Sequence, residues 1–172
     1  MSEAEKISLG VVVERRETGN AWQPHAWRAL TVIPGIDSPE RKLLQEGDGW
    51  AQYLAGTLDL VLYPKETEGY QLNLSQPEPS IYVVVNPDEG DELGVVPFLV
   101  TVCPYEAESY TESDADDVIV DRVSMPPEIH AWVQAFIDTH YVVQPFKKRK
   151  QKPHHPQKGD SHWDLAKRGG PR

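Results

Sequence analysis

The sequence has a single cysteine and no long apolar run, and both facts limit what the chain can be. Cys103 is the one cysteine among 172 residues, so neither an internal disulfide nor a site with several cysteine ligands can form. No stretch approaches the roughly 20 consecutive apolar residues that a membrane-spanning helix needs. The opening residues MSEAEK carry acids and no apolar signal region. We therefore expect a cytoplasmic protein without a membrane segment.

The sequence also lacks the short motifs that accompany common enzyme chemistry. It contains no GxGxxG or GxxxxGK[ST] phosphate loop, no GxSxG nucleophile elbow and no HExxH metal motif. Cys103 ends an apolar segment among acids that would raise the pKa of its thiol, so we expect an inert, buried side chain. The histidines form no ligand pattern either: His25, His130, His140, His154, His155 and His162. We expect no catalytic residue, no metal site and no cofactor.

Acids are concentrated between residues 105 and 117. The stretch holds Glu106, Glu108, Glu112, Asp114, Asp116 and Asp117. Carboxylate oxygens suit hard cations, but the spacing and the central glycine of a calcium-binding loop are missing. We expect a solvent-exposed acidic loop, with a site for a cation or a basic partner as the alternative.

Charge is divided unevenly along the chain. Residues 145–172 hold nine Lys and Arg against two Asp, a balance of +7. Residues 1–144, the acidic body, hold eight Lys and Arg against 25 Asp and Glu, a balance of −17. An acidic body repels phosphate backbones, which argues against nucleic-acid binding by the folded part. The basic tail could bind a polyanion, or it could fold back on the acidic body.

Alternation of apolar and polar residues predicts most of the secondary structure. Six segments read as strands that pair in chain order as antiparallel hairpins, 7–13 with 27–33, 58–62 with 70–74, and 81–85 with 95–103. No linker contains the long helix that parallel pairing would require. Residues 37–49 are polar and turn-rich, with at most one helical turn at 41–44. A short strand is expected at 118–120.

One amphipathic helix is predicted near the end of the acidic body. The segment Met125-Pro126-Pro127-Glu128 suits a helix start, because proline fits the first turn and a carboxylate favours the positive end of the helix dipole. Apolar residues then recur at helical spacing, at Ile129, Trp132, Val133, Phe136 and Ile137. We expect this helix to seal one side of the sheet.

Together these patterns predict a mainly β (α+β) fold. An antiparallel sheet forms a small barrel or sandwich, and one C-terminal amphipathic helix packs on it. We expect one globular domain over residues 1–144. Residues 145–172 combine prolines and basic residues with few apolar ones, which predicts a disordered basic tail.

Two groups of residues are candidates for binding. The first comprises Arg15, Arg16, Trp22, His25, Trp27 and Arg28. Guanidinium groups stack on indoles and reach carboxylates or phosphates, although arginines at strand ends also pair simply with nearby acids. The second is a possible partner-binding arm in the tail, made of Lys147, Lys148, Arg149 and Lys150, for which a merely solubilising tail is the alternative.

Several segments also carry a family resemblance. They are LGVVVERR followed by Trp22, His25, Trp27-Arg28 and VIPG, then YLAGTLDLVLYPKETEGYQLNL, IYVVV, VTVCPYEAESY, VSMPPEIHAWVQAFIDTH and PFKKRK. From Ile7 to about Lys150 the chain resembles a bacterial family of unknown function, typically encoded beside formate dehydrogenase and molybdenum-cofactor genes. Some members are labelled molybdopterin-guanine dinucleotide biosynthesis protein A. A nucleotidyltransferase of that kind would be a larger α/β domain with a glycine-rich loop near its start, which LGVVVERRETGNAW lacks.

The resemblance implies association with a molybdenum- or tungsten-dependent formate dehydrogenase, and it brings no catalytic residues. We therefore expect a non-enzymatic accessory or assembly protein. Its protein partner would be a formate dehydrogenase subunit or a cofactor-insertion protein, and the tail would become ordered on contact. The alternative is a module that binds a pterin or nucleotide against the tryptophans and arginines. Nucleic-acid binding by the tail ranks last, because the charge of the acidic body opposes it.

Overall fold

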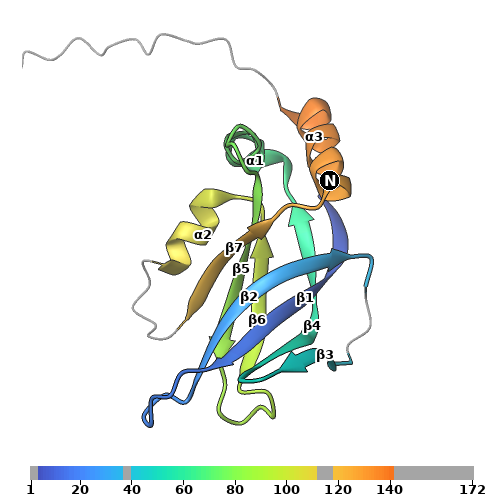
Figure 1. Ribbon diagram of the computed structural model, residues 1–172. Coiled ribbons are helices and arrows are strands. Elements are labelled where there is room, and N and C mark those ends of the chain that lie inside the picture. The colour runs from blue at the N-terminus through green and yellow to red at the C-terminus, as the bar shows by residue number, and fades with distance from the viewer. Residues whose placement is uncertain (1–3, 37–39, 112–117, 142–172) are drawn as a thin grey trace, which may run out of the picture. The chain divides into compact units, whose positions relative to one another are not determined.

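The computed structural model describes residues 4–36, 40–111 and 118–141, which contain two antiparallel sheets and their covering helices (Figure 1). The first sheet has the order β2-β1-β4-β3, with β1 at Glu5–Glu17, β2 at His25–Pro34, β3 at Lys42–Gly47 and β4 at Trp50–Leu62. The second sheet has the order β6-β5-β7, with β5 at Ser80–Pro87, β6 at Val95–Thr101 and β7 at Ile119–Ser124. The mainly β, antiparallel fold predicted from the sequence is confirmed.

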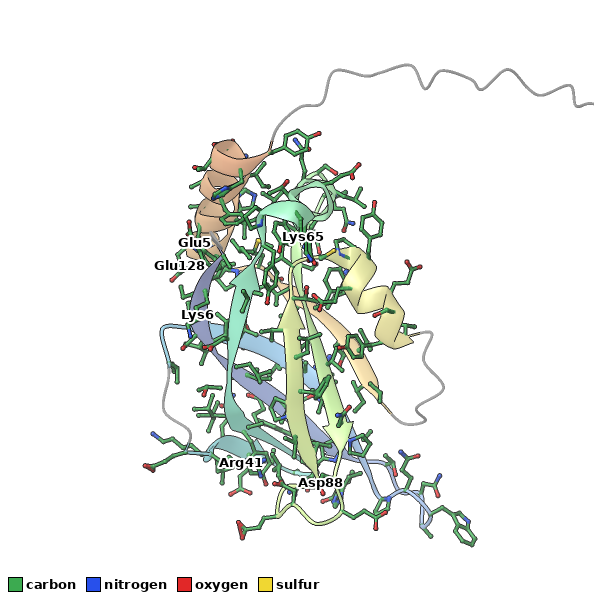
Figure 2. All side chains as sticks on the ribbon, turned by 180° about the vertical axis from the view of Figure 1, so that it is seen from behind. Glu5, Lys6, Arg41, Lys65, Asp88 and Glu128 are labelled. Carbon is green, nitrogen blue, oxygen red and sulfur yellow. The ribbon has the colours of Figure 1, made fainter. Side chains whose placement is uncertain are left out.

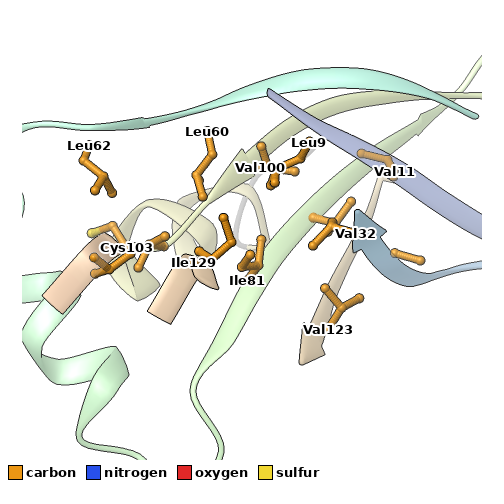
Figure 3. Packing of buried hydrophobic residues seen from close by; sticks show 14 of the residues in the cluster. Leu9, Val11, Val32, Leu60, Leu62, Ile81, Val100, Cys103, Val123 and Ile129 are labelled. Atoms are coloured by element: carbon orange, nitrogen blue, oxygen red, sulfur yellow. The ribbon is translucent and has the colours of Figure 1, made fainter. Parts of the chain in front are cut away.

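The core lies between the two sheets, and strand alternation supplies it. Side chains two residues apart on a strand point to the same face, so the apolar residues of each strand meet those of the other sheet. The inward residues of β1 and β5 are fully buried: Leu9, Val11, Val13, Ile81, Val83 and Val85. Figure 3 shows side chains from both sheets, including Leu9 and Ile81, filling the same space. Strand β1 pairs with β2, and β5 pairs with β6, as predicted.

The sequence left open whether the strands close as a barrel or stack as a sandwich. The described strands form two separate hydrogen-bonded sheets, with β4 lying beside β6 and β2 beside β7. At the β2 side, the Ala29 backbone N–H donates to the Asp121 carboxylate of β7 at 2.8 Å. A side chain thus satisfies an edge donor that no neighbouring strand pairs. The result is a sandwich whose edges approach each other.

Helix α3, Pro127–His140, was predicted from its apolar stripe, and its position differs from the expectation. Its buried residues Ile129, Val133 and Phe136 join the core, but they do so at one end of the sandwich. There α3 packs on α1, Thr67–Leu74, and the Trp132 indole donates to Glu5 at the start of β1 at 2.9 Å. The helix therefore closes the end of the core instead of sealing a sheet face.

The prediction of a strand at residues 70–74 was wrong, because this segment is part of α1, which follows a 3-10 turn at Pro64–Glu66. The apparent alternation suggested one face made of Tyr70, Leu72 and Leu74. The fold instead buries Tyr70 and Asn73, which lie three residues apart, and leaves Leu72 exposed. Strand β4 consequently pairs with β1 and β3 instead of forming a hairpin with this segment.

Three further elements differ from the sequence prediction. Residues 42–47, expected to be turns, form the edge strand β3, joined to β4 through Asp48-Gly49 with Gly49 at φ 81°. An Asp-Gly pair is a strong hairpin signal, so this turn can be recognised from the sequence. A loop was expected over residues 105–117, but residues 105–111 lie in helix α2, Pro104–Thr111. Strand β7, Ile119–Ser124, extends beyond the expected 118–120.

Some sequence predictions fall outside the described residues. These are the domain limit at residue 144, the disordered basic tail at 145–172 and the acids from Glu112 to Asp117. Within the described ranges, no helix is both long and apolar enough to cross a membrane.

Candidate functional site

The arginines and tryptophans predicted to bind a partner lie along the β1–β2 hairpin, and strand alternation divides them between two faces. Arg15 follows Val13 on the core side of the first sheet, whereas Arg16 lies with Glu14 on the outer side. In the strand register Arg15 is opposite Trp27 and Glu14 is opposite Arg28. The single cluster expected from the sequence is therefore two groups.

The first group caps the open end of the core. The Arg15 guanidinium carbon lies 5.9 Å from the Trp27 ring centroid and 5.5 Å from that of Tyr53. The two rings are themselves 6.2 Å apart. A guanidinium over two aromatic faces is held by cation–π attraction and keeps its N–H edge available. The expected arginine–tryptophan contact exists here, with Tyr53 as an additional member.

A shallow cleft of about 300 Å³ opens beside this group. Its lining residues come from β1, from β3 and the residue before it, from β4 and from the β5–β6 loop. They are Arg15, Arg41, Lys42, Leu43, Tyr53, Glu92 and Leu93. Arg41 is committed elsewhere, since it bonds the Asp91 carboxylate and the Ala55 carbonyl. Its hydrogen bond holds the pKa of Asp91 below the usual range. In Figure 2, Arg41 and Asp88 lie at the end of the sandwich away from Glu5 and Glu128. Arg15 and Lys42 bring positive charge to this cleft, and Glu92 brings one negative charge.

The second group surrounds Glu14 on the outer face of the first sheet. Arg16 Nε and Arg28 Nε both donate to Glu14 Oε1, at 2.9 and 3.0 Å. Gln52 Nε2 from β4 donates to the other oxygen at 3.0 Å. The Glu14 side chain is only 3% exposed because these three side chains lie over it, whereas the arginines remain 59% and 58% exposed. The carboxylate is thus covered by its own partners at the surface of the sheet.

The surroundings of Glu14 favour its charged form. The hydrogen bond from Gln52 and those from Arg16 and Arg28 lower its pKa, against the opposing effect of burial. Gln52 in turn accepts a hydrogen bond from Gln45 Nε2 at 2.7 Å. A polar row therefore crosses all four strands of the sheet, from Arg28 on β2 to Gln45 on β3.

The remaining two predicted residues lie at and near the tip of the hairpin, where Trp22 is the most exposed large apolar residue described, at 92%. The tip is nevertheless braced. Thr18 Oγ1 donates to the Gln23 carbonyl at 2.5 Å, and the Trp22 N–H donates to Asn20 Oδ1 at 2.8 Å. Such side-chain to backbone bonds fix a turn locally. His25 is also exposed, at the start of β2.

A second cleft, of about 400 Å³, lies between α1 and α2. It is lined by Lys65, Glu66, Glu68, Gly69, Cys103, Tyr105, Glu106 and Ser109. Burial raises the pKa of the Cys103 thiol, with smaller contributions in the same direction from Glu66 and Glu106. Burial and then Glu106 also raise the pKa of Glu66. A thiol held protonated among carboxyl groups is a poor nucleophile.

Among residues 4–36, 40–111 and 118–141, no group of three or more His, Cys, Asp or Glu side chains is placed to hold a metal ion. The proposed arm from Lys147 to Lys150 lies outside these ranges.

The site residues that were not predicted from the sequence are Glu14, Gln52 and Tyr53. Glu14, an acid between three valines and two arginines, was the available signal, but its partner Gln52 on β4 depends on a register that the sequence does not give.

The chain belongs to a protein family of unknown function. Residues 8–150 match the family described as "Protein of unknown function (DUF3305)". Neither a curated protein nor a solved structure matches the chain. The match agrees with the resemblance to an uncharacterised family, and the activity and partner remain matters for proposal.

Proposed function

We propose that this protein is a non-enzymatic accessory protein that binds a protein partner through the tip of its β1–β2 hairpin. The observation that carries the proposal is Trp22, whose side chain is 92% exposed at the end of a braced turn. Water contact with so much apolar surface is unfavourable, and tryptophan is among the residues that dominate binding energy at protein interfaces.

The hairpin suits this role because it is ordered before contact. Besides the turn bonds, the Thr18 N–H donates to the Pro24 carbonyl at 2.9 Å, and the Glu17 N–H donates to the Gly49 carbonyl at 2.9 Å. One of these hydrogen bonds lies within the hairpin, and the other joins the hairpin to the β3–β4 turn. A preformed contact loses less conformational entropy on association, which increases the affinity available from one exposed indole.

The partner we propose is a subunit of a molybdenum- or tungsten-dependent formate dehydrogenase, or a protein that inserts its cofactor. This follows from the family resemblance, and the role would be maturation or assembly of the enzyme. The lack of a nucleotide loop and the protonated state favoured for Cys103 both support a binding role over catalysis.

Affinity capture tests the proposal. Tagged protein, purified from cells that express formate dehydrogenase, should carry dehydrogenase subunits or cofactor-insertion proteins. The Trp22→Ala variant should lose about tenfold or more of this capture, the usual size of an interface hot spot. Phe98→Ala, which removes an aromatic residue 50% exposed on β6, is the matched control and should capture normally. Unchanged capture by Trp22→Ala would contradict the role of the hairpin.

The cleft beside Arg15 supports a second candidate, the binding of a pterin or nucleotide. A planar ring could stack on Tyr53 while Arg15 and Lys42 bind an anionic group. Titration with a pterin and with a guanine nucleotide, followed by tryptophan fluorescence, distinguishes the candidates. Quenching that Arg15→Ala abolishes, together with no captured protein, would favour the small-molecule module.

A further inference from the structure

On the outer face of the first sheet, one carboxylate binds two arginines, whereas a simple surface ion pair has one cation for each anion. Two guanidinium groups converge on the single oxygen Glu14 Oε1, one from Arg16 and one from Arg28. Since both donors bind one acceptor at 2.9 and 3.0 Å, their Nε atoms lie within about 6 Å of each other. Two positive groups are held side by side by one negative group, which leaves a local charge of +1.

Both guanidinium groups keep most of their donors. A guanidinium has five N–H donors, and each of these uses its Nε–H on Glu14. Among the described residues, the four terminal N–H groups of Arg16 and of Arg28 have no bonded partner, and the two side chains are 59% and 58% exposed. Two adjacent sets of donors are therefore available to solvent.

Glu14 orients these donors. Without it, two long side chains of like charge would move apart, and bringing them together would cost side-chain entropy on every binding event. The carboxylate is itself fixed by Gln52 at 3.0 Å, and Gln52 by Gln45 at 2.7 Å. The sheet thus supplies a preorganised receptor whose geometry suits two carboxylate oxygens, the usual partners of paired guanidinium donors.

The surroundings indicate a protein ligand. Arg16 lies opposite Trp50 in the strand register, so an indole and a guanidinium share this face, and both residue types are common at interface hot spots. The charge of −17 on residues 1–144 repels a long phosphodiester chain. At physiological ionic strength, screening acts over about 8 Å, so a short acidic segment feels mainly the local positive charge.

We propose that Arg16 and Arg28, held by Glu14, form a receptor for the carboxylate groups of an acidic segment in the protein partner. The inference rests on the proposed function and adds the chemistry of the partner, since the receptor lies on the same hairpin as Trp22. The hairpin tip supplies apolar contact, and the arginine pair supplies direction and specificity.

A peptide titration tests the receptor. The probe is a fluorescent acetylated tetraglutamate amide, added to the full-length protein at physiological ionic strength. Wild type should bind it saturably, with shifts of the Arg16 and Arg28 Nε–H signals in nuclear magnetic resonance spectra. Arg16→Lys/Arg28→Lys keeps both charges beside Glu14 but removes the planar donor sets, and it should weaken binding about tenfold. Arg122→Lys, at an exposed arginine on β7 of the second sheet, is the matched control and should bind as wild type does.

Each remaining outcome is decisive. Equal binding by the double lysine variant, or no saturable binding by wild type, overturns the receptor. Displacement of the peptide by inorganic phosphate at equal concentration overturns its assignment to carboxylates.

If the double lysine variant still captures dehydrogenase subunits while Trp22→Ala does not, the receptor fails and the proposed function stands. If wild type binds the peptide through both arginines but captures no dehydrogenase protein, the proposed function fails and the receptor stands.

Discussion

Asn73 shows how one buried amide can hold several elements of the fold together. Its side chain is fully buried, and its Nδ2 donates to the Ser80 and Val102 carbonyls, each at 2.7 Å. Its Oδ1 accepts from the Ser80 N–H at 3.0 Å. These bonds join α1 to the start of β5 and to the residue that follows β6. The amide satisfies three backbone groups that water cannot reach.

We expect Asn73→Leu to destabilise the protein by about 3 kcal/mol or more, because a leucine of similar size leaves two carbonyls and one N–H buried without partners. Urea unfolding followed by circular dichroism measures the change. Gln71→Leu, at an exposed position of the same helix, should change stability by less than about 0.5 kcal/mol. A similar effect of the two substitutions would show that the bonds of Asn73 contribute little.

Glu14 makes a prediction about pH. Its pKa is lowered in the folded protein, so the stability that its charge contributes is present above the unfolded pKa, near 4.3, and is lost as the pH falls through the lower folded value. Glu14→Gln should therefore cost about 1 kcal/mol at pH 7. The difference from wild type should shrink below about pH 4. Unfolding curves between about pH 3 and about pH 7 measure this difference. A difference that does not depend on pH would contradict the assigned charge.

At the scale of elements, α1 packs unusually closely against the segment that leads into α2. A Cβ added at Gly69 would lie 2.7 Å from Cys103 Sγ, closer than such atoms approach in proteins. Alanine normally stabilises a helix by up to about 1 kcal/mol relative to glycine. Here we expect the contact to reverse the sign, because the sulfur of the buried Cys103 must shift to admit the added methyl group.

We therefore expect Gly69→Ala to destabilise the protein, and Cys103→Ala to relieve part of the effect by removing the sulfur. The double variant should be more stable than the sum of the two single changes predicts, by about 1 kcal/mol. Thermal or urea unfolding of the four proteins gives this coupling directly. Additive changes would mean that α1 and Cys103 do not press on each other.

The elements also show what the sequence could predict. Local periodicity was sufficient for β1, β2, β5, β6 and α3, because each has an apolar face that repeats within the element. It failed for α1, where Asn73 is buried by contacts with Ser80 and Val102. It failed for β3, whose residues are all exposed and which exists by pairing with β4. Apolar periodicity within the element could show neither, because Asn73 is buried by contacts outside α1 and β3 depends on its pairing with β4 across the Asp48-Gly49 turn.

The candidate site was predictable only in part. Arg15 and Trp27 lie together as expected, whereas Arg16 and Arg28 pair with Glu14, which was the alternative weighed for strand-end arginines. The division follows from strand alternation, since neighbouring residues 15 and 16 must point to opposite faces. Gln52 and Tyr53 entered the two groups through the β1–β4 register, which depends on bulges that the sequence did not reveal.

At the scale of the whole molecule, the described residues form a packed sandwich, and the exposed indole and the arginine pair lie on one of its hairpins. The sandwich core fixes β1 and β2, the bonded turn fixes Trp22, and Glu14 fixes the arginine pair. Such an arrangement presents an exposed indole and two exposed guanidinium groups from one fixed hairpin. These features support the proposal that the protein acts by binding.

The proposed function requires Trp22 on this hairpin for formate dehydrogenase maturation. The most direct measurement uses a strain lacking the gene, complemented with wild type, Trp22→Ala or Phe98→Ala, and assays formate dehydrogenase activity and cofactor content at equal accessory-protein levels. We predict that wild type and Phe98→Ala restore both, and that Trp22→Ala restores less than about a tenth, as expected for the loss of an interface hot spot. Full activity and cofactor content in the uncomplemented strain, or full restoration by Trp22→Ala, would contradict the claim.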